Sequence, residues 1–261
     1  MVSVLCITYN HAPYIRDALE GFVGQRTDFR FEVLVHDDAS EDGTADIVRE
    51  YAARYPDLIR PVLQTANQYS RGLQPTRTFL RPLVRGRYVA FCEGDDYWTD
   101  PGKLQKQVDA LEAHPEADIC AHPALSLWPD GSRHLMGPKR GGKVIPAERV
   151  ILCGGAFVAT ASLLCRSSIY LKDSTMRDIL FNDYTLQIQG SLRGGMLYLP
   201  DCMSAYRFRH PGSWTASHRA EDPLLLARAL DALDAETAGR FHRAIRRRER
   251  RDRLEQWFKR R

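Results

Sequence analysis

Several sequence signatures of common enzyme classes are absent from this chain. There is no GxGxxG dinucleotide fingerprint and no GxxxxGK[ST] phosphate loop, so neither hydride transfer nor P-loop chemistry is indicated. There is also no GxSxG elbow, and the eight histidines show no HExxH spacing. These absences argue against most hydrolases.

Long apolar runs and paired cysteines are missing as well. No stretch reaches the roughly 20 apolar residues that span a bilayer, and the first residues lack a basic leader and a small-residue cleavage site. We therefore expect no export signal and a cytoplasmic protein. The six cysteines are scattered without a CxxC pair, which favours buried free thiols over a disulfide or zinc framework.

The composition that remains is that of a globular protein. The 261 residues are 44% hydrophobic and 27% charged, enough to bury the core of one large domain. The first 120 residues alternate between strand-like apolar runs and stretches with helical periodicity. This alternation indicates an α/β fold with a mostly parallel central sheet flanked by helices. The expected strands are 2–8, 31–37, 59–64 and 87–93, followed by an extended stretch at 117–128 and strands at 196–200 and 203–209.

Polar residues gather where three of these strands end. Residues 8–10 follow the first strand, 37–38 end the second and begin the loop after it, and 93–96 end the strand 87–93. Ligands of parallel sheets bind beyond the carboxyl ends of the strands. The sequence therefore predicts a site at this edge of the sheet.

The run EGDDYW at 93–98 places three carboxylates within four residues. Neighbouring carboxylates raise one another's pKa unless a cation lies among them, and Mg²⁺ commonly binds one or two carboxylates together with substrate phosphates. The alternative is a solvated acidic turn in which Asp100 caps the next helix.

A second acidic strand end is the run VHDDASEDGT at 35–44. Asp38 is placed to accept hydrogen bonds from a base edge or from ribose hydroxyls, whereas Asp42 and Gly43 are a turn signal and Thr44 is a helix cap. A receiver domain, phosphorylated on aspartate, also uses acidic strand ends. It would need a lysine late in the sheet, and no convincing one occurs.

Five segments in order resemble family 2 glycosyltransferases, which have the GT-A fold. They are ITYNHAPYI, FEVLVHDDASEDGT, NQYSRG, YVAFCEGDDYW and DPGKLQKQ, and they cover residues 1–125 closely. A looser similarity continues through FNDYTLQ at 181–187 and YRFRHPGSWT at 206–215. The resemblance implies a sugar-nucleotide donor, a divalent metal and net inversion at the anomeric carbon.

The resemblance also implies donor-binding residues. Thr8, Tyr9 and Asn10 end the first strand against the nucleotide, with Tyr9 against the base or ribose and Asp38 at the base edge. Arg207 lies on the loop that folds over the donor diphosphate in similar enzymes.

The DxD position of the family is occupied here by Glu93, Gly94 and Asp95. The longer arm of Glu93 suits a ribose or water-mediated contact as well as direct ligation, so Glu93 is assigned to the donor and Asp95 to the metal. A one-residue slip would exchange Asp95 for Asp96, and either or both would bind Mn²⁺ or Mg²⁺. His210 is a further candidate for metal or phosphate.

The catalytic base of the family is a carboxylate that opens a helix on the acceptor side, usually in a Glu-Asp pair. The pair here is Asn182-Asp183, which assigns the base role to Asp183. The structural alternative is that Asp183 only caps its helix.

Residues 240–261 are strongly basic, with 11 Lys and Arg against 3 Asp and Glu, so residues 1–239 have a net charge of −4. We expect a helix with Phe241 and Ile245 on one side and Leu254, Trp257 and Phe258 on nearly the opposite side. Peripheral contact with the inner face of an anionic membrane and a solvated tail both fit this pattern. Nucleic acid is not expected as a partner, because no aromatic–basic platform is present.

By this resemblance the chain divides into a nucleotide-sugar-binding half at 1–125, an acceptor-binding half of the same GT-A domain at 126–220 and a helical basic tail at 221–261. It predicts an inverting transferase that moves a sugar from a nucleotide diphosphate, UDP or dTDP preferred and GDP left open, to a hydroxyl of a glycan, lipid-linked glycan or protein. The product would belong to a cell-surface polysaccharide, glycolipid or glycoprotein.

Two other functions stay open. A nucleotidyltransferase shares the acidic strand ends but usually has a Gly-rich loop after the first strand, which is absent here. A catalytically silent sugar-nucleotide-binding protein would be expected to have lost one of the carboxylates of Asp38, Asp95 and Asp183, yet all three are present.

Overall fold

A mixed, mostly parallel sheet organises the protein. The computed structural model describes residues 1–138, 143–210 and 223–259. Within these ranges, eight strands pair in the order β3-β2-β1-β4-β10-β6-β11-β9. Their bounds are β1 Val2–Thr8, β2 Phe31–Asp37, β3 Ile59–Leu63, β4 Tyr88–Phe91, β6 Ile119–Ala121, β9 Lys143–Ile145, β10 Leu164–Arg166 and β11 Met196–Tyr198.

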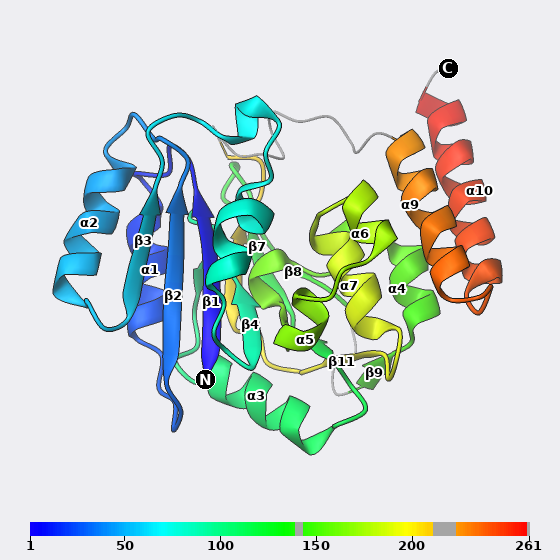
Figure 1. The fold of residues 1–261 in the computed structure, drawn as a ribbon, viewed down its shortest axis with the longest axis horizontal. Coiled ribbons are helices and arrows are strands. Elements are labelled where there is room, and N and C mark those ends of the chain that lie inside the picture. Colours follow the sequence, from blue (N-terminus) through cyan, green and yellow to red (C-terminus); the bar gives the residue numbers. More distant parts are fainter. Residues whose placement is uncertain (139–142, 211–222, 260–261) are drawn as a thin grey trace.

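The first four strands form the parallel part of the sheet, as expected from their apolar runs. β1 lies between β2 and β4 and runs parallel to both, and β3 extends the sheet beyond β2. Figure 1 shows β1, β2 and β3 side by side with their carboxyl ends at the top of the view. β10 is antiparallel to both of its neighbours, β4 and β6, so the sheet is mixed at its centre.

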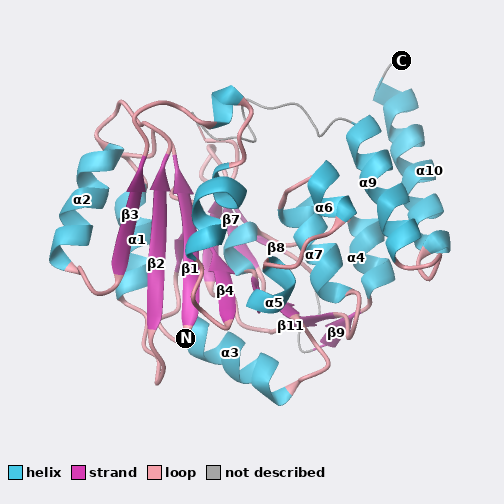
Figure 2. Ribbon diagram, in the orientation of Figure 1, coloured by secondary structure: helices cyan, strands magenta, loops and turns pink. Residues whose placement is uncertain are grey.

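Each face of the sheet is covered by helices. Because side chains alternate along a strand, Val4 and Cys6 of β1 enter one core and Leu5 enters the other. The first core includes buried residues of α1 (Ile15–Val23), α2 (Thr44–Arg54) and α3 (Lys103–Ala113). The second includes residues of α4 (Ala147–Cys153), α5 (Ser167–Tyr170), α6 (Thr175–Ile179) and α7 (Asp183–Ser191). Figure 2 shows these helical layers around the magenta strands.

A second, smaller sheet carries part of the predicted site. Its order is β5-β12-β7-β8, with β5 Tyr97–Trp98, β12 Ser204–Arg207, β7 Ala124–Leu127 and β8 Arg133–Met136. The stretch 117–128, expected to be extended, is divided between the two sheets. The chain leaves the central sheet after β6 and enters the second sheet at β7, with His122 and Pro123 between them.

The C-terminal segment is partly built into the core. Its helices are α9 (Pro223–Glu236) and α10 (His242–Lys259), which confirms the helix expected within 240–261. Phe241 and Ile245 are buried with residues of α9, whereas Leu254, Trp257 and Phe258 are exposed. The two opposite apolar sides predicted for this segment are therefore present, and one of them packs.

The sequence predicted free cysteines and no membrane-spanning segment, and the structure can be compared with both predictions. All six cysteines are free; Cys6, Cys92, Cys120 and Cys165 are buried, whereas Cys153 and Cys202 are exposed. Among the described residues, none of the helices has the length and apolar character needed to cross a membrane.

Candidate active site

The ends of β1 and β2 are joined by a network of hydrogen bonds. Asp38 donates its backbone N–H to the carbonyl of Thr8 at 3.0 Å, and Asn10 donates its own to Ser40 Oγ at 2.8 Å. Asn10 has φ 54°, a left-handed conformation that asparagine tolerates better than most residues. The predicted nucleotide-binding run 8–10 is therefore held against the loop after β2, and Tyr9 within it is 42% exposed.

The two carboxylates after β2 are occupied by hydrogen-bond donors of the protein. Asp37 accepts from Ser40, at 2.5 Å from the hydroxyl and 3.0 Å from the backbone N–H. Asp38 is buried and accepts from the backbone N–H groups of Gln68 at 2.8 Å and Tyr69 at 3.0 Å. Asp38 thus fixes the start of the 3-10 turn Tyr69–Arg71, part of the NQYSRG segment. Its contact with a base edge remains a prediction.

The acidic loop after β4 lies directly on the end of β1. Gly94 donates its N–H to the carbonyl of Ile7 at 2.9 Å. A Cβ at position 94 would lie 2.7 Å from Thr8 Oγ1 and 2.9 Å from Ile15 Cδ1, so a side chain there would collide with its neighbours. The glycine between Glu93 and Asp95 is therefore required by this close approach.

Asp95 is held between two histidines. It is buried, and its Oδ2 lies 2.9 Å from Nε2 of His210 and 3.8 Å from Nε2 of His11. Burial acts to raise the pKa of Asp95, but the hydrogen bond with His210 and the charge of His11 outweigh it and keep that pKa below its usual value. The structure thus brings the predicted metal candidates Asp95 and His210 together.

Asp96 is buried and Glu93 is partly buried, and both carboxylates have few partners among the described residues. Oδ1 of Asp96 accepts from the backbone N–H of Arg207 at 2.9 Å, while its buried Oδ2 has no partner among the described residues. Burial, and then the charges of Asp95 and Glu93, raise the pKa of Asp96 well above its usual value. Burial, followed by the charges of Asp95 and Asp183, raises the pKa of Glu93 to about 8. Ionised carboxylates in this state would be stabilised by a cation.

This donor set fits a hard divalent cation held jointly by protein and substrate. In the described part of the chain, no group of three or more His, Cys, Asp or Glu side chains is spaced to bind a metal alone. Mg²⁺ sites, however, commonly use one or two carboxylates and complete their coordination with substrate phosphates and water. The unpartnered Oδ2 of Asp96, next to Asp95, matches that requirement.

Arg207 links the second sheet to the acidic loop. One guanidinium nitrogen donates to the carbonyl of Asp95 at 2.7 Å, and another pairs with the carboxylate of Asp17. The guanidinium carbon lies 5.1 Å from the ring centre of Tyr14 and 4.6 Å from that of Tyr97. These contacts anchor the loop that carries Asp95. A contact of Arg207 with the donor diphosphate remains a prediction, and residues 211–215 of the YRFRHPGSWT segment lie outside the described residues.

Asn182, rather than Asp183, caps α7. The Asn182 side chain accepts from the backbone N–H of Thr185 at 2.9 Å, and Thr185 Oγ1 accepts from the backbone N–H of Asn182 at 3.3 Å, forming a capping box. The N-cap position that the structural alternative gave to Asp183 therefore belongs to Asn182, and the base role of Asp183 stays a prediction. The asparagine that departs from the usual Glu-Asp pair has a structural role of its own.

Asp183 is the first residue of α7, and its carboxylate lies in an environment that favours the protonated form. Its Oδ1 accepts from the backbone N–H of Tyr184 at 2.8 Å. Its Oδ2 has only long contacts, 3.4 Å to Gln187 Nε2 and 3.5 Å to Thr160 Oγ1. Burial raises the pKa of Asp183 to about 6, although these hydrogen bonds act against the shift. Thr160, which contacts Asp183, is followed by Ala161, whose carbonyl accepts from the indole N–H of Trp98 at 3.1 Å, so α7 begins near the EGDDYW run.

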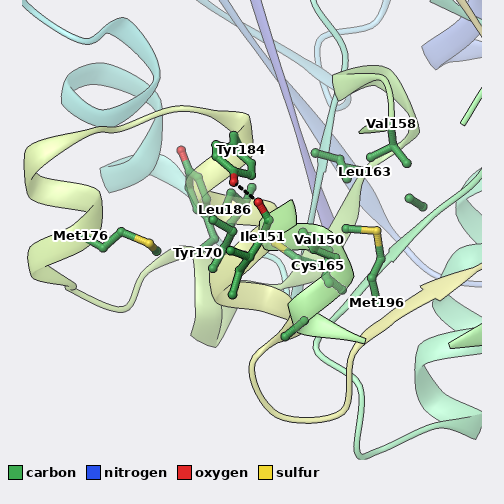
Figure 3. Close-up of a cluster of buried hydrophobic side chains, with 14 of the residues drawn as sticks. Val150, Ile151, Val158, Leu163, Cys165, Tyr170, Met176, Tyr184, Leu186 and Met196 are labelled. Atoms are coloured by element: carbon green, nitrogen blue, oxygen red, sulfur yellow. Dashed lines mark hydrogen bonds between the residues drawn. The ribbon is translucent and has the colours of Figure 1, made fainter. Parts of the chain in front are cut away.

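The position of Asp183 is fixed by the packing of α7 on α4. Tyr184 is buried, and its hydroxyl donates to the carbonyl of Ile151 at 2.5 Å, the dashed line in Figure 3. Gly155 lies against the same helix, since a Cβ there would be 3.2 Å from Cβ of Tyr184. The glycines that interrupt the apolar stretch 150–165 thus allow close packing next to Asp183.

Sequence reasoning missed three side chains of this site. His11 lies beside Asp95, and its only sequence signal is that it directly follows the strand-end run 8–10. Thr160 and Gln187 face the carboxylate of Asp183, and no signal pointed to Thr160. Gln187 could have been found from its spacing of four residues after Asp183, which places both on one side of a helix.

Comparison with known proteins identifies related sequences. The model of the family described as Glycosyl transferase family 2 matches residues 3–210. An uncharacterized protein of Mycobacterium tuberculosis is 38% identical over 221 residues, which is 83% of this chain and 61% of the relative. The Escherichia coli UDP-Glc:alpha-D-GlcNAc-diphosphoundecaprenol beta-1,3-glucosyltransferase WfaP is 30% identical over 112 residues, 43% of this chain and 41% of that protein. The chain thus spans about three fifths of the mycobacterial relative and less of WfaP.

Solved structures share the fold. The structure of S. aureus TarS (residues 1–349) in complex with UDP-GlcNAc superposes with a TM-score of 0.67 at 21% identity, covering 90% of this chain and 66% of that TarS fragment. The mannosyltransferase PcManGT from Pyrobaculum calidifontis, in complex with GDP-Man and Mn²⁺, superposes with a TM-score of 0.54 at 19% identity, covering 91% of this chain and 75% of that enzyme. These matches confirm the expected α/β architecture of GT-A type.

Proposed function

We infer the function from the premise that this chain belongs to glycosyl transferase family 2, whose model matches most of its length. We propose that it transfers a sugar from a nucleotide diphosphate to an acceptor hydroxyl with inversion at the anomeric carbon. The observation that supports this most is the convergence of carboxylates from separate elements. Asp95 and Asp96 follow β4, Asp183 begins α7, and Glu93 lies close enough for Asp183 to raise its pKa.

Asp183 has the properties of a general base. Its pKa of about 6 leaves it ionised at neutral pH yet basic enough to accept a proton, which is the range in which proton transfer is efficient. It removes the proton from the acceptor hydroxyl as the oxygen attacks the anomeric carbon. A C–O bond forms on one face of the sugar while the bond to the diphosphate breaks on the other, so the configuration inverts and the nucleoside diphosphate leaves with the electron pair.

The loops at the carboxyl ends of β1 and β2 are proposed to bind the nucleotide. Tyr9 is exposed there and can lie against the base or ribose, while Asp38 holds the 3-10 turn that would border the base. Uridine or thymidine is the preferred base. The UDP-GlcNAc bound by TarS supports a uridine donor, and the GDP-Man bound by PcManGT keeps guanosine a candidate.

Asp95, Asp96 and His210 would hold Mn²⁺ or Mg²⁺, with Glu93 directed to the ribose or to a bound water. The cation supplies charge neutralisation for the leaving diphosphate. The Mn²⁺ bound with GDP-Man in PcManGT supports this assignment. The residues of the chain contribute by orienting these ligands: His11 and Arg207 hold Asp95 from two sides.

The acceptor is proposed to be a glycan hydroxyl, with a lipid-linked glycan as the preferred class and a protein as a further candidate, in the synthesis of a cell-surface polymer. The name of WfaP describes transfer to a diphosphoundecaprenol-linked sugar, which supports an acceptor of this class. Such an acceptor is presented at the inner face of a membrane, so we propose a cytoplasmic protein.

The test is a transfer and hydrolysis assay with UDP-, dTDP- and GDP-sugars in the presence of Mn²⁺ or of a chelator. Release of nucleoside diphosphate, together with NMR of a product whose anomeric configuration is opposite to that of the donor, is expected. Retention of configuration would contradict the base role of Asp183. Pyrophosphate release from a nucleoside triphosphate and a sugar 1-phosphate would identify a nucleotidyltransferase, and nucleotide binding without turnover of any donor would identify a silent binding protein.

A further inference from the structure

The two sides of α10 differ in what they contact. One side packs: Phe241 and Ile245 lie in the core with α9, and Arg248 lies over the ring of Tyr184 in α7 at 5.3 Å. Arg248 is also paired with Asp252, one turn further along the same side. These contacts hold the helix in one rotational orientation, so its opposite side faces outward.

The outward side is cationic along most of its length. Arg243, Arg247, Arg250 and Arg253 are all exposed, and none of them forms an ion pair within the part of the chain that the structure describes. At helical spacing these four side chains lie on the side opposite Phe241 and Ile245. Arginines that are not neutralised by acidic neighbours are available to an anionic surface.

The same side ends in an apolar group. Leu254 is 52% exposed, Trp257 47% and Phe258 69%. The rings of Trp257 and Phe258 contact each other, with their centres 4.9 Å apart. An open hollow of about 410 Å³ is lined by Arg250, Arg253, Leu254 and Trp257, so guanidinium and apolar side chains border the same space. Arginine beside tryptophan is the combination found where helices lie at a membrane–water interface.

The location of this group relative to the candidate site matters for function. In Figure 1 the carboxyl end of α10 lies on the same side of the molecule as the carboxyl ends of β1, β2 and β3. The acidic loops of the site follow those strand ends. A partner surface that contacts the carboxyl end of α10 would therefore lie on the same side of the molecule as the candidate active site.

We propose that the outward side of α10 docks the protein on an anionic lipid bilayer, with Arg243, Arg247, Arg250 and Arg253 at the headgroups and Leu254, Trp257 and Phe258 inserted at the interface. Charge complementarity selects the partner, because four unpaired arginines suit anionic headgroups, and the apolar end suits the acyl region below them. A nucleic acid would match the arginines but would leave the apolar group without a role. The docking does not depend on which sugar or acceptor the enzyme uses.

The experiment measures co-sedimentation of the full chain with phosphatidylcholine vesicles that contain or lack phosphatidylglycerol. Binding is expected only to the anionic vesicles and should weaken with salt. Arg247→Gln/Arg250→Gln should weaken partitioning about thirtyfold, about fivefold for each arginine. Trp257→Ser/Phe258→Ser should weaken it at least about tenfold, because two apolar rings would no longer insert. Brominated lipid should quench tryptophan fluorescence more in the wild type than in Trp257→Ser/Phe258→Ser, since the inserted Trp257 is then missing from the four tryptophans.

The matched control is Arg26→Gln/Arg30→Gln, which removes the same charge at exposed positions between α1 and β2. This variant should bind anionic vesicles like the wild type, and all variants should keep the wild-type circular dichroism. Equal losses in the control and in the α10 arginine variant would overturn the proposal, since only net charge would then matter. It would also be overturned if wild-type protein failed to bind anionic vesicles, bound an RNA or DNA oligonucleotide more tightly than vesicles, or used Trp257 and Phe258 only for self-association in sedimentation velocity.

Discussion

Two acidic strand ends lie at the same edge of the central sheet, yet their carboxylates differ in hydrogen bonding and in pKa. After β2, the carboxylates of Asp37 and Asp38 each accept two hydrogen bonds from Ser40, Gln68 and Tyr69. After β4, a carboxylate oxygen of Asp96 is buried without a partner, and burial together with like charges raises the pKa values of Glu93 and Asp96.

The difference separates two functions of buried carboxylates. A carboxylate whose oxygens accept backbone N–H groups stabilises a loop conformation, because the charge is solvated by the protein itself. A cluster that lacks such donors is costly in the ligand-free protein and gains most from a cation or a proton. Asp183 belongs to the second kind, since its pKa is raised to about 6 by burial. The following predictions test this division, from the largest expected effect to the smallest.

Replacing Asp183 with asparagine should lower turnover by about 10²–10⁴-fold, the usual contribution of a general base. Nucleotide affinity should be unchanged, because the donor loops are at β1 and β2. Turnover and nucleotide affinity are measured by diphosphate release and calorimetry. Asn182→Ser keeps the helix cap and serves as the control, with turnover near that of the wild type. Unchanged turnover in Asp183→Asn would remove Asp183 from the base role.

Asp95→Asn should weaken metal-dependent nucleotide binding by about tenfold or more. Replacing a residue that supports a metal site typically lowers metal affinity by about that factor. Calorimetry with Mn²⁺ and with a chelator measures the difference. Asp57→Asn, an exposed position, should bind as the wild type does. If the wild type bound nucleotide equally with and without chelator, the metal assignment would fail.

Asp38→Ala should lower the free energy of unfolding by about 1–3 kcal/mol, because the N–H groups of Gln68 and Tyr69 would lose their acceptor. Urea denaturation measures this loss. The exposed control Asp57→Ala should change stability by less than about 0.5 kcal/mol. A neutral effect of Asp38→Ala would mean that the backbone groups find other partners, and that the β2 end is not a structural site.

Asp183→Asn should have the opposite effect and raise the free energy of unfolding at pH 8 by about 3 kcal/mol, since the pKa is shifted by about two units and one unit corresponds to about 1.4 kcal/mol. The folded-state pKa of about 6 lies above the unfolded value of 3.8, so the native state of the wild type loses stability as pH rises through this window. The asparagine variant has no such loss. The difference in the free energy of unfolding between variant and wild type, measured by urea denaturation, should disappear toward pH 4. A difference that persisted at pH 4 would show that ionisation of Asp183 is not its cause.

The pH dependence of the wild-type reaction provides the finest test. The base acts in its ionised form, so kcat/KM should increase with pH and be half-maximal near pH 6, the pKa of Asp183. Initial rates between pH 5 and 8 measure the curve. A half-point near pH 4, the value of an exposed aspartate, would show that burial does not act on the catalytic group.

The succession of strands and helices in the first 120 residues, and the polar residues at the strand ends, followed from the sequence, because both depend on local patterns. An apolar run with alternating faces predicts a strand, and successive βα units place strand ends at one edge. The helix starting at Asp183 and the helix within 240–261 were likewise predicted from local sequence patterns. The division of the extended stretch 117–128 between two sheets was not predicted, because nothing local indicates that the chain changes sheets after β6.

The partners of the charged residues were decided only by the tertiary structure. His210 meets Asp95 across 115 residues of sequence, and Arg207 meets Asp17 across 190. Two acidic pairs that look alike in sequence became a loop anchor and a candidate cation site. Backbone N–H groups of Gln68 and Tyr69 reach both oxygens of Asp38, whereas that of Arg207 reaches only one oxygen of Asp96. Hydrogen bonding and burial depend on such long-range contacts, whereas residue type and periodicity do not, so the sequence indicated the candidate residues and only the fold decided the partners and burial of each.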